Sequence, residues 1–216
     1  MEEIFPGVYE NKGKLYTLNI APGSRVYGEH LLIEGGKEYR SWNPYKSKMA
    51  AAILKGLKEM PVKRNSRILY LGAANGTTVS HFSDISTEGI IYAVEISVRA
   101  MGDLFEVCRT RKNIIPILAD AGKPEKYALM VNDVDFVYQD ISQKDQVGIF
   151  IKNMDRFSVN KGMLMVKVKA RSIDISMHPR KIFEKVKKEI KNEFEIKEST
   201  YLNPYSKDHM AILVER

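Results

Sequence analysis

The sequence of 216 residues has little of several features that mark particular classes of protein. It contains a single cysteine, Cys108, which excludes an internal disulfide framework and fits a reducing compartment. No apolar run is long enough to span a bilayer. The first residues, MEEIF, lack the basic and apolar stretches of a signal peptide. These absences predict a soluble, cytoplasmic protein. Cys108 follows Val98, Met101, Leu104 and Phe105 on the apolar face of an expected helix, so it is predicted to pack in the core.

The charge balance is basic, with 34 Lys and Arg against 27 Asp and Glu and a formal net charge of +7. Such a balance favours a polyanionic partner, although many basic proteins bind no nucleic acid. The length and a hydrophobic fraction of 44% allow one full core and a small appended module. One main domain is therefore expected.

The chain divides into two regions of different pattern. In residues 1–45, short apolar or aromatic runs alternate with turn signals around 11–13, 21–23 and 35–36, which predicts a small antiparallel β module. From residue 46 the pattern changes to a helix-forming segment, KSKMAAAILKGLKEM. We expect residues 46–216 to form the main domain.

Strand-like and helix-like segments alternate through this second region. The expected strands are RILYLG, GIIYAVEI, NIIPILAD, VDFVYQDI and GMLMVKVKA. Helices are expected from residue 76, through MGDLFEVC, through QVGIFIKNM and over 179–194, where the lysine-rich face reads as solvated surface. This alternation predicts a parallel sheet covered by helices on both faces. Residues 193–202 and 209–216 have no room for a crossover helix between them, so they should form an antiparallel hairpin.

The glycine-containing loop in LYLGAANGTTVSH is the sharpest local feature, because an apolar strand runs into Gly72 and Gly76 just before a helix. Small residues let a ligand approach the backbone, and the helix N-terminus offers free N–H groups. The spacing is not that of the dinucleotide fingerprint, and a tight structural turn is the competing interpretation. Acids end the next three strands at Glu95, Asp120 and Asp140. Glu95 could accept ribose hydroxyls or cap the following helix, but the loop and the acids together favour an adenosyl pocket.

Several motifs in this order resemble the fibrillarin family, and the resemblance covers almost the entire chain. They are YRSWNPYKSKMAAAI, LGAANGTTVSH, YAVEIS, ILADAGKPEKY, VYQDISQKDQ, VKARSID and PYSKDH. No Gly/Arg-rich extension precedes them, so the archaeal form is the one resembled. Gly122 departs from the arginine common in the family at that position. The resemblance implies an α/β fold, the seven-stranded Rossmann-like sheet of class I methyltransferases, and S-adenosyl-L-methionine as cofactor.

The family motifs also imply site residues. Cofactor contacts would come from the glycine loop and the strand ends: Gly72, Ala73, Ala74, Gly76, Thr77, Thr78, Glu95, Ile96, Asp120, Ala121, Asp140, Ile141, Ser142 and Gln143. The related ribose 2′-O-methyltransferases use a Lys-Asp-Lys set with a fourth polar residue, and the matching positions are Lys48, Asp140, Lys169 and His209. No metal is implied.

Several of these positions have a competing interpretation, and Lys48 could orient the ribose or neutralise phosphate. Lys169 would lie nearest the nucleophile, while Lys167 on the same strand face is the alternative. His209 could complete a proton network or only cap the last strand. His81 is expected to pack or hydrogen-bond behind the cofactor loop, and the aromatic rings of the WNPY segment, Trp42 and Tyr45, are expected to pack at a domain junction rather than stack on a base.

The resemblance finally implies a function and partners. The chain would be the catalytic subunit of a box C/D ribonucleoprotein, methylating ribose 2′-hydroxyls of rRNA and possibly tRNA. Its partners would be guide and target RNA, a Nop-family scaffold protein and a ribosomal-protein-like kink-turn binder. The alternatives are a stand-alone RNA methyltransferase, a non-catalytic RNA-associated scaffold, and a nucleotide-binding oxidoreductase, which would need a dinucleotide glycine pattern absent here.

Overall fold

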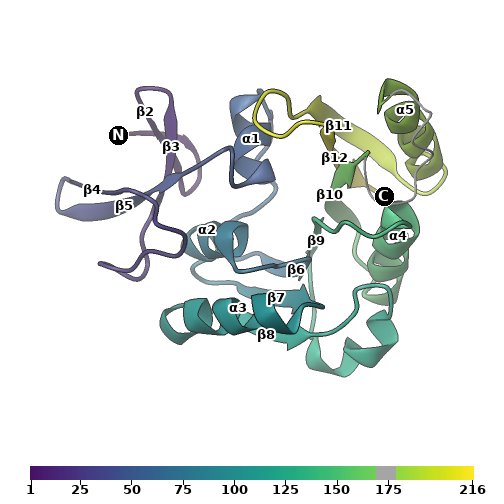
Figure 1. The fold of residues 1–216 in the computed structure, drawn as a ribbon, viewed down its shortest axis with the longest axis horizontal. Helices are drawn as coiled ribbons and strands as arrows, with labels where there is room; N and C mark the ends of the chain where they lie inside the picture. Colours follow the sequence, from purple (N-terminus) through teal and green to yellow (C-terminus); the bar gives the residue numbers. More distant parts are fainter. Residues whose placement is uncertain (169–178) are drawn as a thin grey trace.

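Two sheets lie side by side in the fold, a small antiparallel one and a larger mixed one (Figure 1). The computed structural model describes residues 1–168 and 179–216. Within these residues, no helix is long and apolar enough to cross a membrane.

The first sheet is built from the N-terminal residues, as the alternation of apolar runs and turns predicts. Its strands pair antiparallel in the order β1-β2-β3-β5-β4. They are β1 Glu2–Phe5, β2 Val8–Asn11, β3 Lys14–Leu18, β4 Leu31–Glu34 and β5 Lys37–Trp42. The antiparallel module is thereby confirmed, while its division from the rest as a separate domain at residues 45/46 stays a prediction.

The second sheet has a parallel centre and an antiparallel end, and the described residues place seven strands in it. The order is β11-β12-β10-β9-β6-β7-β8, with only the β12 pairings antiparallel. The strands are β6 Arg67–Leu71, β7 Ile90–Glu95, β8 Ile114–Leu118, β9 Phe136–Gln139, β10 Lys161–Lys167, β11 Glu195–Tyr201 and β12 His209–Glu215. This confirms the Rossmann-like methyltransferase sheet and its terminal hairpin.

Helices cover both faces of the second sheet, because alternate strand residues enter two separate cores. In β6, Ile68 and Tyr70 join the core that contains α1 and α2 residues, whereas Leu69 and Leu71 join the core that contains α4 and α5 residues. The helices are α1 Lys48–Leu54, α2 Thr77–Ile85, α3 Val98–Thr110, α4 Gln146–Arg156 and α5 Pro179–Ile190, with short 3-10 turns η1 Pro124–Lys126 and η2 Ala128–Met130.

Apolar periodicity in the sequence puts Val98, Met101, Leu104 and Phe105 on one buried face of helix α3, and the structure corrects part of this prediction. Met101 and Leu104 are buried as expected, but Val98 and Phe105 are 73% and 54% exposed. The buried stripe instead continues through Val107, because positions 101, 104 and 107 share one side of the helix. Cys108 packs half-buried against the core, as predicted, and burial raises the pKa of its thiol to about 11.

The junction between the two sheets contains the predicted aromatic packing. Trp42 at the end of β5 is 1% exposed and stacks on the ring of His81 in α2, with centroids 4.8 Å apart. His81 bonds Thr17 Oγ1 and the Tyr27 hydroxyl at 2.7 Å each. Both residues therefore pack, as predicted, whereas Tyr45 is 69% exposed and does not pack as predicted.

Candidate cofactor and catalytic site

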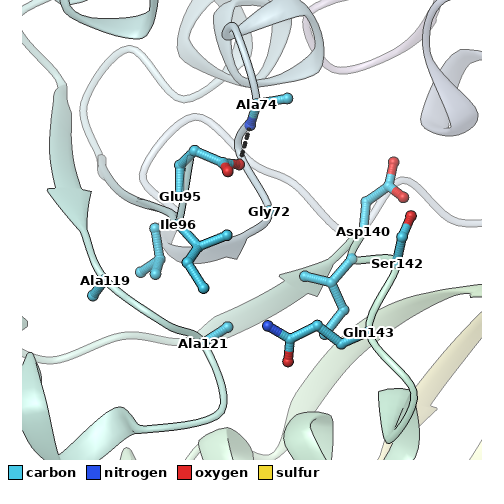
Figure 2. A pocket seen from close by; sticks show the side chains of 11 residues that line it. Gly72, Ala74, Glu95, Ile96, Ala119, Ala121, Asp140, Ser142 and Gln143 are labelled. Atoms are coloured by element: carbon cyan, nitrogen blue, oxygen red, sulfur yellow. Dashed lines mark hydrogen bonds between the residues drawn. The ribbon is translucent and has the colours of Figure 1, made fainter. Parts of the chain in front are cut away.

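A cavity of about 390 Å³ opens where the parallel strands end, lined by the loops that follow β6, β7, β8 and β9. Ala74 and Glu95 lie on one side of it, and Asp140, Ser142 and Gln143 on the other (Figure 2). The full lining is Gly72, Ala74, Val94, Glu95, Ile96, Ala119, Ala121, Asp140, Ile141, Ser142 and Gln143. Carboxyl ends of parallel strands are where α/β folds bind ligands.

The loop after β6 requires glycine at Gly72. Its φ is +84°, and a Cβ there would meet the Asp140 carbonyl oxygen at 2.3 Å. The loops that follow the neighbouring strands β6 and β9 can approach each other only without a side chain at this position. At the other end of the loop, Gly76 caps α2 without a side-chain hydrogen bond, as expected for a helix N-terminus that keeps N–H groups free.

Glu95 at the end of β7 fulfils one expected role and keeps capacity for the other. Its Oε2 accepts the Ala74 N–H and its Oε1 accepts the Ser97 N–H, each at 2.8 Å. Ser97 is the N-cap of α3, so the carboxylate does tie down the start of that helix. An ionised carboxylate has about four acceptor sites. Glu95, lining the cavity, can therefore still accept hydroxyl groups from a ligand.

Asp120, the acid that follows β8, is oriented through its neighbours. Asp120 Oδ1 accepts the Gly122 N–H at 2.9 Å and Gln143 Nε2 at 3.2 Å. These hydrogen bonds, with the nearby Lys123 ammonium, lower the pKa of the Asp120 carboxyl. Asp120 itself does not line the cavity, but Gln143 does, so the acid is linked to the cavity wall through the amide.

The remaining cofactor positions predicted from the motifs do not line the cavity. Thr78 is buried, and its hydroxyl donates to the Ser47 hydroxyl at 3.0 Å, while the Thr77 hydroxyl bonds Asn75. Ala73, Gly76, Thr77 and Thr78 are absent from the cavity lining. Conversely, Val94 and Ala119 line it and were not predicted. Both sit beside predicted residues, so strand-end position was the signal that could have found them.

Lys48 and Asp140, 92 positions apart in the chain, meet at one wall of the cavity. Lys48 Nζ donates to Asp140 Oδ2 at 2.7 Å, with 24% and 20% of the two side chains exposed. Lys48 opens α1, and Asp140 follows β9. Beneath this pair lie the buried rings of Tyr70 and Tyr138, whose pKa values are raised well above the usual range by burial and, in addition, by the Asp140 charge. The pair is thus partly exposed to solvent and close to buried aromatic rings.

His209, the first residue of β12, lies in the electrostatic field of the same pair. Burial lowers the pKa of its imidazole, and Lys48 and Lys167 lower it further. The hydrogen bond to the Lys207 carbonyl and the Asp140 charge oppose this change. Its Nδ1 lies 2.6 Å from the Lys207 carbonyl oxygen, which can only accept. Nδ1 therefore carries the proton, and in the neutral ring Nε2 remains an acceptor.

Of the four predicted catalytic residues, the structure thus brings together Lys48, Asp140 and His209. Lys169 lies outside the described residues. Its alternative, Lys167, ends β10 opposite His209, and its Nζ lies 3.5 Å from the Ser142 hydroxyl on the cavity wall. Among the residues that the structure describes, no group of three or more His, Cys, Asp or Glu side chains is arranged to hold a metal ion.

Comparison with known proteins identifies the family. The Fibrillarin family model matches residues 1–216. The fibrillarin-like rRNA/tRNA 2′-O-methyltransferase of Methanothermobacter thermautotrophicus is 50% identical over 211 residues, covering 97% of this chain and 94% of that protein.

Two solved structures extend the likeness to three dimensions. One is Aeropyrum pernix fibrillarin with natively bound S-adenosyl-L-methionine, at 43% identity and a TM-score of 0.88, with 99% and 96% of the two chains covered. The other comes from a fibrillarin/Nop5p complex, at 43% identity and a TM-score of 0.90, with both chains fully covered. Since the family model spans all 216 residues and the relatives align over nearly their whole length, this chain belongs to the fibrillarin family.

Proposed function

We propose that this chain transfers the methyl group of S-adenosyl-L-methionine to ribose 2′-hydroxyls of rRNA, and of tRNA, at positions chosen by a box C/D guide RNA. The carrying observation is the Lys48–Asp140 ion pair at the wall of a cavity whose other wall presents Glu95. The relative from Methanothermobacter thermautotrophicus is named for methylation of the same RNA classes.

The cavity residues fit S-adenosyl-L-methionine by their chemistry. Glu95 has acceptor sites for the two ribose hydroxyls, and Ile96, 57% exposed on the wall, offers an apolar surface for the adenine ring. Absence of a side chain at Gly72 lets the ligand approach the backbone. The Aeropyrum pernix relative, which holds this cofactor, supports the assignment. Ala73, Gly76, Thr77, Thr78 and Asp120 would then support the wall without lining the cavity.

Bound S-adenosyl-L-methionine supplies a methyl group made electrophilic by the adjacent sulfonium. Methyl transfer forms an O–C bond to the ribose oxygen, breaks the S–C bond and releases the 2′-hydroxyl proton, so the protein must align the oxygen and take the proton. Asp140 holds Lys48 in place, and Lys48 orients the ribose oxygen by hydrogen bonding. His209 Nε2 is an acceptor for the released proton. Lys169, by its family motif, would lie nearest the nucleophile.

The same proposal extends to the assembly. The fibrillarin/Nop5p complex supports a Nop-family scaffold as partner of this chain. A guide RNA paired with the target RNA and a ribosomal-protein-like kink-turn binder complete the particle, on the strength of the family motifs. The net charge of +7 suits a protein that contacts RNA phosphates. The cytoplasmic location expected from the sequence composition stays a prediction.

Tritium transfer tests this function. The assembled particle is given tritiated S-adenosyl-L-methionine and either an unmodified guide-paired RNA or the same RNA already carrying a 2′-O-methyl at the target nucleotide. We expect label on the unmodified RNA alone. Equal labelling of both would place the reaction elsewhere on the RNA, labelling without a guide would favour a stand-alone enzyme, and cofactor binding without transfer would favour a scaffold.

A further inference from the structure

Two tyrosines form an exposed aromatic pair beside the candidate catalytic residues. The rings of Tyr45 and Tyr205 meet edge to face, with centroids 5.3 Å apart and an interplanar angle of 71°. Tyr45 is 69% exposed, and Tyr205 is half-buried. An edge-to-face pair is worth about 0.5–1.5 kcal/mol, so it orients the Tyr45 ring without covering it.

The backbone also holds Tyr45 in place. Its N–H donates to the Asn43 side-chain oxygen at 2.9 Å, in the turn that leads from β5 to α1. On the other side of the pair, the Ser206 N–H bonds the Leu202 carbonyl in the loop between β11 and β12. A large apolar ring that is oriented but left exposed, next to a reactive site, is typical of a ligand contact rather than of core packing.

The position of the pair relates it to the substrate rather than to the cofactor. Tyr45 lies three residues before Lys48, and Tyr205 lies four residues before His209. Neither ring lines the cofactor cavity. The pair therefore sits beside the catalytic residues on the two segments that carry them, where the rest of a polymeric substrate must lie.

Two exposed lysines lie close to the pair in the chain, with one acid, Asp208, beside the second of them. Lys46 directly follows Tyr45, and Lys207 lies two residues after Tyr205; both lysines are exposed. Lys46 is held over the Tyr27 ring, 5.4 Å from its centroid, and donates to the Tyr27 carbonyl at 3.3 Å. Aromatic rings with lysines beside them match a sugar-phosphate strand, because the rings pack on nucleosides while the ammonium groups meet phosphates.

We propose that Tyr45 and Tyr205 form a subsite for the target RNA strand, packing in the minor groove against the riboses of the nucleotides next to the methylated one. This inference rests on the proposed function. The minor groove of A-form RNA is wide, shallow and lined with 2′-hydroxyls, so a ring can reach these sugars without unpairing a base. The Tyr45 hydroxyl, which bonds no described residue, then hydrogen-bonds a neighbouring 2′-hydroxyl.

Kinetics with modified RNA test the subsite. Tyr45→Ala in the assembled particle should raise KM for guide-paired RNA about tenfold and leave kcat within about twofold, because the contact serves ground and transition states alike. Tyr45→Phe should raise KM about threefold with ordinary RNA. With 2′-deoxy nucleotides on both sides of the target, Tyr45→Phe should have no further effect, since the hydrogen-bond partner is already gone.

Tyr201→Ala is the matched control. Tyr201 is 42% exposed and makes an edge-to-face pair with Phe183, also at 5.3 Å, but it packs over α5. Cofactor affinity and melting temperature of each variant separate misfolding from loss of RNA contact. Equal KM values for the Tyr45→Ala and Tyr201→Ala particles would contradict the proposed subsite. A change in kcat alone for Tyr45→Ala would contradict it as well. If the wild-type particle methylates no ribose, the proposed function fails, and the RNA dissociation constants of the same variants still decide the subsite.

Discussion

Two ion-pair clusters in this molecule use the same side-chain chemistry in opposite surroundings. Between the sheets, Asp84 of α2 bonds both Arg40 and Arg111, and Arg40 also pairs with Glu29; all four side chains are 0% exposed. At the cofactor cavity, Lys48 and Asp140 form one pair with a fifth to a quarter of each side chain exposed.

The difference separates a structural cluster from an accessible one. A buried ion pair gains little net stability, but loss of one partner leaves an uncompensated charge in the interior. The buried group of Glu29, Arg40, Asp84 and Arg111, called the closed cluster below, has two acids and two arginines, so its formal charges cancel. It joins β5 to α2. The Lys48–Asp140 pair, called the open pair below, can exchange partners with a ligand because part of each side chain is exposed. Surroundings, not residue type, decide which cluster can take part in chemistry.

The two histidines near these clusters repeat the comparison. His81 is fully buried beneath Trp42, and burial together with Arg40 and Arg111 holds the pKa of its imidazole well below the usual range. His209 is half-buried at the start of β12, with a pKa that burial also lowers. Both rings are neutral near pH 7, but only His209 lies beside the open pair.

The largest expected effect is on the open pair. Asp140→Asn should reduce methyl transfer about 10²–10⁴-fold, because Lys48 loses the carboxylate that orients it. Cofactor affinity should change far less, and the melting temperature should stay within a few degrees. Rates from tritium transfer, with calorimetry on the same samples, measure both. Full activity in this variant would remove Asp140 from the mechanism.

The closed cluster should respond in the opposite way. Asp84→Asn leaves Arg40 and Arg111 buried beside one remaining acid, Glu29, and should cost about 3–5 kcal/mol of unfolding free energy. Denaturant unfolding measures this loss, and activity at low temperature should persist in the folded fraction. The exposed pair of Arg64 and Glu88 is the control, since Glu88→Gln should change stability by less than about 1 kcal/mol. Equal losses in both variants would contradict the contrast drawn between the clusters.

His209→Gln should slow transfer about 10–100-fold at pH 7.5, because glutamine cannot take up the proton. In the wild type, acidification protonates Nε2 and removes the acceptor. Since the pKa is below 6.5, the acidic limb of the rate profile should fall below that pH. The limb should vanish in the variant. An unchanged profile would leave His209 with only the capping role.

The smallest effect is the pH dependence of stability from His81. Its folded pKa is depressed, so below pH 6.5 the unfolded chain binds a proton that the folded chain does not. Stability should therefore fall as pH drops below 6.5, by up to about 1.4 kcal/mol per pH unit until the folded pKa is reached. Denaturation curves of the wild type and of His81→Phe at several pH values isolate the contribution of His81 to the pH dependence of stability. His30→Gln, a change of an exposed histidine, is the control and should leave this pH dependence unchanged.

Prediction from the sequence succeeded where the signal was local. The strands and helices of the main region appear where apolar periodicity places them, and Glu95, Asp120 and Asp140 follow successive strands. The first helix ended sooner than its composition indicated, at Leu54, because Gly56 takes a φ of +92°. The expected packing of Tyr45 was wrong, since a preceding proline does not determine which side of a turn faces solvent.

The sequence by itself determined the succession of elements, the glycine at the tight loop and the strand-end acids, because each depends on residues close together in the chain. The family resemblance had grouped Lys48 with Asp140, but only the tertiary structure decided which charged side chains form ion pairs. Lys48 reaches Asp140 across 92 positions, and Arg40 reaches Asp84 across 44. Such contacts depend on how helices pack on the sheet and how much water that packing excludes, and neither is written in the local pattern that predicts a helix or a strand.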